Sequence, residues 1–218
     1  MRRGGRERVE FRARLGHRWR GMARLPLVAL SIALSATGCE RIAGPQAMVA
    51  GALAEASQPG AGFEVDSCGR LSLARVQFSR LLVKPEGEGM VAVATVDAEG
   101  AFVDGARVSY LGLERVPFRH EAGRWQIAGA LLPALEASLS LMCRRRQALA
   151  RGDRDAVEAL GFSPVEARSR QAGEDRVRRW VVRVDRERVE VLEEGSIGNG
   201  RFVLKRENGA LRPAPTVF

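Results

Sequence analysis

The sequence predicts an α+β domain: an antiparallel β-meander, a central helical segment and a second β-meander, preceded by an N-terminal leader and a short tether. Apolar and polar residues alternate over 71–127 and again over 177–204, which predicts strands with one buried face. Apolar residues at helical spacing occupy 133–149 between them. Runs of strands that stay apart from a run of helices favour an antiparallel sheet over a parallel, doubly wound one.

The first meander is expected to contain several strands and short turns. Strands lie on both sides of the turn at 85–89, and a further strand is expected at about 107–119. Pro117 within that strand indicates an edge or a bulge, because proline cannot donate a hydrogen bond to a neighbouring strand. A turn at 121–123 then leads into a short strand that closes the meander.

The helical segment is expected to begin at Pro133, since proline suits the first turn of a helix. Cys143 lies on the apolar face of this helix and should point into the core. The arginines at 144–146 are interpreted as a solvated face. Two shorter helices should follow, because 155–158 and 163–166 each have the spacing of a capping box.

The second meander should contain three strands between 177 and 204 and end in a hairpin at Asn208-Gly209. The glycine-rich segment 195–200 joins two of these strands. It lacks the Lys-Ser/Thr ending of a nucleotide-binding loop and opens no helix, so we interpret it as a hairpin turn.

The leader has the composition of an export signal, with an apolar stretch at 25–34 that is too short to span a bilayer stably. The following segment Ala36-Thr-Gly-Cys39 resembles the lipobox of bacterial lipoproteins. The resemblance implies that Cys39 is lipidated, becomes the new N-terminus and anchors the protein to a membrane of the cell envelope. Glu40 follows the cysteine where Asp could stand, which by resemblance to enteric lipoproteins favours the outer membrane. The alternative is an ordinary signal peptide or anchor helix, with Cys39 as a bystander.

The first 21 residues hold eight arginines, an unusually long basic start that points to Met22 as the true first residue. The chain is accordingly divided into a signal peptide, a lipidated cysteine with its tether, and a single α+β domain, with a division of that domain into two subdomains as the alternative: 1–38, 39–62, 63–218, and 63–130 with 131–218.

The net charge of +9 is carried mostly by the leader. Nine of the 35 basic residues and two of the 26 acidic residues lie within 1–38, which leaves 26 basic against 24 acidic residues and a net charge of +2. A nucleic-acid partner is therefore not expected, since such partners select strongly basic surfaces.

Two cysteines remain beyond the lipidation site, Cys68 and Cys143. In an oxidising envelope compartment an even pair predicts a disulfide. The bond would close a loop of about 75 residues and stabilise the fold by about 4 kcal/mol. The alternative is two buried free thiols.

Part of the chain resembles bacterial proteins with the nuclear transport factor two-like cone fold. The segment 116–127, in which a polar turn precedes a buried Trp, is similar to the closing hairpin of that fold, and so is 201–209. The segment 147–160 is similar to its opening helices. In that family the opening helices precede the sheet, whereas most of the helix follows strands here.

Few residues point to catalysis or to a cofactor. His120 is the only histidine beyond the leader and lies at an expected hairpin turn. One histidine and two distant cysteines fall short of a zinc site, and no metal ligand set or cofactor motif is predicted.

We therefore expect a lipid-anchored, non-catalytic envelope protein that binds a small apolar ligand or docks onto an envelope protein partner. Tyr110, Trp125 and Trp180 are the aromatic residues expected to line a pocket on the sheet. One alternative is a cone-fold enzyme with His120 or a buried carboxylate as base. Another is a structural or assembly subunit, which should expose an apolar patch.

Overall fold

The computed structural model describes residues 44–163, 176–186, 188–208 and 210–214. The leader and Cys39 lie outside the described residues, and so does most of the short helix expected at 163–166. Within the described ranges, no helix is long and apolar enough to cross a membrane.

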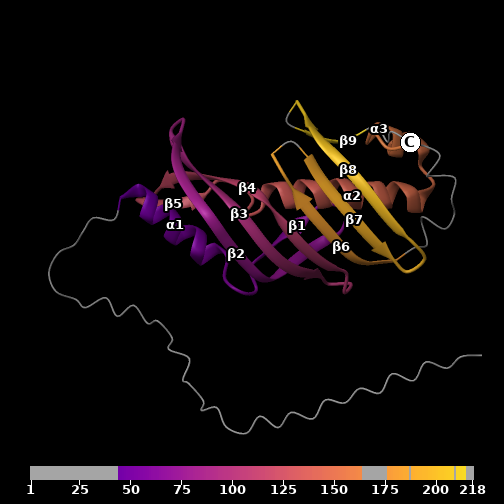
Figure 1. Ribbon diagram of the computed structural model, residues 1–218, viewed down its shortest axis with the longest axis horizontal. Helices are drawn as coiled ribbons and strands as arrows, with labels where there is room; N and C mark the ends of the chain where they lie inside the picture. The colour runs from indigo at the N-terminus through magenta and orange to yellow at the C-terminus, as the bar shows by residue number, and fades with distance from the viewer. Residues whose placement is uncertain (1–43, 164–175, 187, 209, 215–218) are drawn as a thin grey trace, which may run out of the picture. The chain divides into compact units, whose positions relative to one another are not determined.

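The fold is mostly β, so the prediction of an α+β domain is wrong. The nine described strands form one mixed sheet in the order β1-β2-β3-β4-β6-β7-β8-β9, and β5 pairs with β4. Figure 1 shows this sheet curling, with α2 lying across its strands on one side. The elements are α1 (Pro45–Ala56), β1 (Gly62–Val65), β2 (Gly69–Glu86), β3 (Gly89–Phe102), β4 (Arg107–Glu121), β5 (Arg124–Ile127), α2 (Pro133–Arg151), α3 (Arg154–Ala159), β6 (Val177–Val184), β7 (Arg188–Gly195), β8 (Asn199–Glu207) and β9 (Ala210–Pro213).

The two expected meanders are halves of this single sheet. β4 pairs with β6 in parallel, 107–112 against 179–184, while the other described pairs are antiparallel. A parallel pair needs a long crossover, which the segment containing α2 and α3 supplies. Local sequence patterns do not reveal which distant strands become neighbours, and this is why the strands on either side of the helical segment were expected to form two separate meanders.

The strands of the first half are also longer than alternation suggests. β2 runs for 18 residues and contains register shifts at 73–75 and 79–82. Each shift moves side chains to the other face of the sheet, so one long strand reads as several short ones in the sequence.

The main core lies between the concave face of the sheet and α2. The helix begins at Pro133 as predicted, and Leu135, Leu139 and Met142 are fully buried along its sheet-facing side. Gly152 ends it in the left-handed conformation that caps many helices. α3 follows, but its cap is Asp153, whose side chain accepts a hydrogen bond from Ala156, rather than the expected Asp155.

A second, smaller cluster forms where α1 packs on the same sheet, within the segment expected to be a tether. Val49 and Leu53 of α1 are buried, at 0% and 2% exposure, against Met90, Val116 and Phe118 of β3 and β4. Residues 45–56 are therefore part of the folded body.

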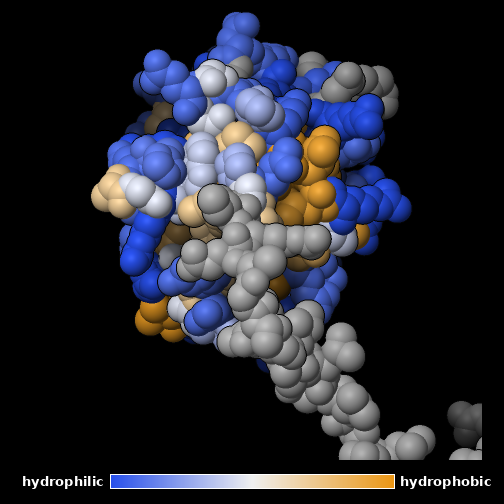
Figure 2. Space-filling model, turned by 90° about the vertical axis from the view of Figure 1, so that its left-hand side faces the viewer, coloured by the Kyte–Doolittle hydropathy of each residue, from blue (hydrophilic) through white to orange (hydrophobic). Residues whose placement is uncertain are grey.

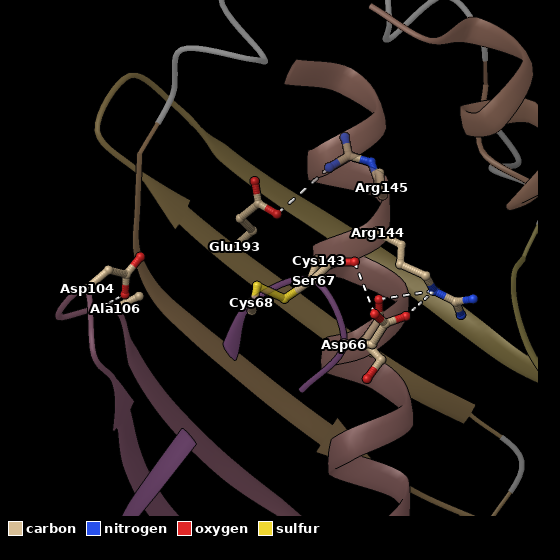
Figure 3. The surroundings of a disulfide bond; sticks show 10 residues. Asp66, Ser67, Cys68, Asp104, Ala106, Cys143, Arg144, Arg145 and Glu193 are labelled. Carbon is tan, nitrogen blue, oxygen red and sulfur yellow. Dashed lines mark hydrogen bonds and ion pairs between the residues drawn. A yellow bond between two sulfur atoms is a disulfide. The ribbon is translucent and has the colours of Figure 1, made fainter. Parts of the chain in front are cut away.

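The disulfide expected between Cys68 and Cys143 is present, with Cα atoms 5.7 Å apart. Figure 3 shows that it joins the turn between β1 and β2 to the middle of α2. Cys143 faces the core at 1% exposure, as predicted, and Cys68 is exposed. An ion pair between Arg144 and Asp66, 3.7 Å long, lies beside the bond.

The arginines at 144–146 do not form one solvated face as expected. Arg144 is exposed, but Arg145 is 7% exposed and lies over the rings of Phe162 and Phe202, 5.3 and 4.4 Å from their centroids. The carboxylate of Glu193 on β7 pairs with Arg145 at 3.8 Å and with Arg146. This network ties α2 to the second half of the sheet.

Candidate functional site: an opening in the sheet beside strand β4

The three aromatic residues expected to line a pocket lie in different parts of the core. Tyr110 and Trp180 are 2% and 1% exposed within the main core. Trp125 belongs to the second cluster, where its ring lies 5.2 Å from that of His120. His120 is exposed at the end of β4. The structure thus does not bring these residues together around one cavity.

A buried carboxylate lies instead on the concave face of β4. Alternation along this strand points Tyr110, Gly112 and Glu114 to the same face, and Glu114 is only 1% exposed. Gly112 has no side chain, so the Tyr110 phenol lies over it and donates a 2.7 Å hydrogen bond to Glu114 Oε1. A Cβ at Gly112 would lie 2.7 Å from that phenol oxygen, which explains the glycine.

Glu114 also caps α2 from a distant strand. Its carboxylate accepts hydrogen bonds from the backbone N–H groups of Ala134 and Leu135, at 3.0 and 3.1 Å. These are among the first amides of the helix, which have no partner within it. A negative charge here also complements the helix dipole. Both carboxylate oxygens are engaged, so the geometry assigns Glu114 the task of fixing the helix start against the sheet.

The pKa values of this pair are displaced by burial. Burial raises the pKa of Glu114, although hydrogen bonds from Tyr110 and the two amides and the charge of Arg206 act in the opposite direction. Burial and the adjacent carboxylate raise the pKa of Tyr110 as well. The sequence carries a readable signal for this pair: Glu114 is an acid on the otherwise apolar face of a strand.

The sheet opens beside this pair. β6 pairs with β4 as far as Gly112 and ends at Val184, and β5 pairs with β4 only from Phe118. Between these points, residues 113–117 of β4 have no described strand along their β6-facing edge. The expected edge or bulge at Pro117 corresponds to this place.

Two adjoining hollows occupy the opening, with volumes of about 630 and 510 Å³. They share Leu113 of β4 and the residues at the turn between β6 and β7, namely Val184, Asp185, Arg186 and Arg188. The larger hollow lies over the outer face of the sheet beside Leu111, which is 52% exposed. The smaller one reaches Glu114 and the start of α2.

Arginines dominate the charge of the opening. Arg80, Arg183, Arg186 and Arg188 line the larger hollow, and all four are exposed. Among the nearby carboxylates, Glu86 pairs with Arg115 and Glu190 pairs with Arg201, while Asp185 lines both hollows and accepts a hydrogen bond from the backbone N–H of Arg186. None of the four arginines forms an ion pair within 4.0 Å with a carboxylate of the described ranges. The opening therefore presents net positive charge beside free strand edge.

Other kinds of site find less support among the described residues. No group of three or more histidine, cysteine, aspartate or glutamate side chains there can hold a metal ion. Large exposed apolar side chains are scattered, with Met48 on α1 and Leu81 and Leu82 on β2. Figure 2 shows the end of the molecule that carries α1, where both apolar and polar side chains reach the visible surface.

Comparison with known proteins gives no relative from which a role can be transferred. No family model, no curated protein and no solved structure matches the chain.

Proposed function

We propose that this chain is a lipid-anchored protein of the cell envelope whose folded unit is a non-catalytic module that docks a partner protein. The observation that carries the proposal is the opening beside β4, where an unpaired strand edge lies next to exposed arginines. Free backbone groups on a strand edge are a template for pairing with another chain.

The arrangement of the core supports docking over the binding of a small apolar ligand. Tyr110 and Trp180 are buried in the main core with the apolar residues of α2, and the hollows of the opening are lined by charged as well as apolar residues. Glu114 has both oxygens engaged in holding α2, which gives no support to a buried carboxylate acting as base.

Anchoring is supported by the lipobox-like segment ending in Cys39. Two or more acyl chains hold a protein stably at a membrane, whereas one chain binds only marginally. The test is intact mass of the protein from the membrane fraction, compared with Cys39→Ala. We expect a mass that fits cleavage before Cys39 plus acyl chains, and loss of both in the variant. An unprocessed chain outside the membrane fraction would overturn the anchoring.

Docking is tested in cells with a photoreactive benzophenone amino acid placed in the opening. Asp185 is a suitable position, because it lines both hollows and is exposed. Val103 is the control, since it is 90% exposed at the turn between β3 and β4. We expect a discrete protein adduct from position 185 and none from 103. The absence of an adduct at 185, or the same adducts from both positions, would refute docking at the opening.

A further inference from the structure

The free edge of β4 has a defined set of hydrogen-bonding groups. In a strand, backbone groups of alternate residues face the same side. The carbonyl of Pro117 accepts a 2.8 Å hydrogen bond from Ala128, which follows β5, so the odd-numbered residues of β4 face away from β3. Leu113 and Arg115 therefore turn their N–H and C=O groups toward the opening, where no described strand pairs with them.

We infer that the opening takes an extended acidic peptide segment of the partner, which adds a strand along residues 113–117 of β4. The inference rests on the proposed function and names the chemistry of the partner. The free edge spans about 17 Å at roughly 3.3 Å per residue, which suits a short extended segment. Main-chain hydrogen bonds supply the affinity in this mode of recognition, and alternate side chains supply the specificity.

The arginines of the larger hollow, which lies over the outer face of the sheet, favour acidic side chains in the bound segment. Arg183, Arg186 and Arg188 come from the end of β6 and the start of β7, directly across from the free edge. Arg80 approaches from the opposite side, at the β2 register shift, where its own φ is +53°. Guanidinium groups suit carboxylates because they bind them with two parallel hydrogen bonds.

The smaller hollow, which reaches Glu114 and the start of α2, favours a different residue type in the bound segment. Its lining includes the apolar side chains of Val189, Leu211 and Pro133, the buried carboxylate of Glu114, and Arg206. A charged acid that reached this depth would lose its hydration beside the buried carboxylate of Glu114, whereas an apolar side chain would find apolar contacts. Because side chains of a strand alternate between the two faces, the segment should alternate acidic and apolar residues.

The test measures binding of a fluorescein-labelled peptide of alternating glutamate and valine, long enough to cover 113–117, to the full chain in detergent. A second peptide has the same sequence but N-methylated amides at alternate positions, which keeps the charge and removes the donors needed for pairing. We expect the N-methylated peptide to bind about tenfold more weakly or worse, because its backbone cannot pair with β4. Equal binding of the two peptides would refute strand addition.

Protein variants test separately the contribution of the arginine charges and that of backbone pairing with β4. Arg186→Glu with Arg188→Glu should weaken binding of the unmethylated peptide by about tenfold or more. The control is Arg154→Glu with Arg178→Glu, which makes the same change in net charge at exposed positions outside both hollows. It should leave binding nearly unchanged. Leu113→Pro should weaken binding, because it removes a donor that faces the opening and that no described strand uses. Pro117 already occupies an equivalent position on this edge.

The outcomes separate this inference from the proposed function. An adduct at position 185 in cells, together with no binding of either peptide, would keep the docking role and overturn the acidic strand. A single-stranded oligonucleotide that binds more tightly than the peptide and loses binding in Arg186→Glu with Arg188→Glu would assign the arginines to a nucleic acid instead. If the control variant Arg154→Glu with Arg178→Glu lost as much peptide affinity as Arg186→Glu with Arg188→Glu, the effect would come from net charge alone and the site would be overturned.

Discussion

The hydroxyl of Tyr110 donates a 2.7 Å hydrogen bond to Glu114 across the bare backbone of Gly112, and Glu114 in turn holds the first amides of α2. One strand thereby fixes the position of the helix around which the sheet curls. Residues 113–117 of the same strand form one border of the opening, so the packing beneath β4 and the free edge beside it depend on neighbouring residues.

Gly112→Ala should destabilise the fold by about 1–3 kcal/mol, the usual cost of adding a group to a filled core. Its Cβ would lie 2.6 Å from the Cβ of Val184 and 2.7 Å from the Tyr110 oxygen. Gly51→Ala is the matched control, because nothing lies within 4 Å of a Cβ at this position in α1. Urea denaturation of both variants measures the difference. Equal stability of the two would contradict the close packing over Gly112.

Glu114→Gln should change the pH dependence of stability. Burial raises the pKa of Glu114 above its usual 4.5, so the folded state retains the proton at a pH where the unfolded state has lost it. The contribution of Glu114 is therefore fully present below pH 4.5 and falls as pH rises through the raised pKa. Unfolding free energies of both proteins, measured between acid and neutral pH, should converge as pH rises. A difference in unfolding free energy that widens as pH rises would show that the pKa of Glu114 is lowered in the folded state instead.

Arg145→Ala should cost about 3–5 kcal/mol, because it leaves the buried carboxylate of Glu193 with less compensation and uncovers two aromatic rings. Arg144→Ala, one residue earlier on α2, removes an exposed arginine and should cost less than about 1 kcal/mol. Thermal or denaturant unfolding distinguishes the two. Similar losses of unfolding free energy in the two variants would show that Arg145 is as solvated as Arg144.

Reduction of the Cys68–Cys143 bond should lower the free energy of unfolding by about 4 kcal/mol, because a loop of 75 residues is then free in the unfolded state. Exposed Cys68 gives a reductant access to the bond in the folded protein. Denaturant curves with and without reductant, alongside the double variant Cys68→Ala with Cys143→Ala, give the value. Labelling of both cysteines by a thiol reagent before reduction would show that the bond is absent.

Local patterns in the sequence determined the local elements. The start of α2 at Pro133, the inward position of Cys143 and the hairpin pairing of β8 with β9 were each predicted. Each depends on a few neighbouring residues. The lipobox-like segment before Cys39 is also a property of the sequence alone, and it stays a prediction because it lies outside the described residues.

Only the tertiary structure decided which distant strands became neighbours. The parallel pairing of β4 with β6 joined two expected meanders into one curled sheet. It also placed Val184 against Gly112, and because β6 ends at Val184 the β4 edge beyond this contact is open. Strand pairing depends on side-chain packing and backbone hydrogen bonds between segments far apart in the chain, and alternation within one strand carries no record of its partner.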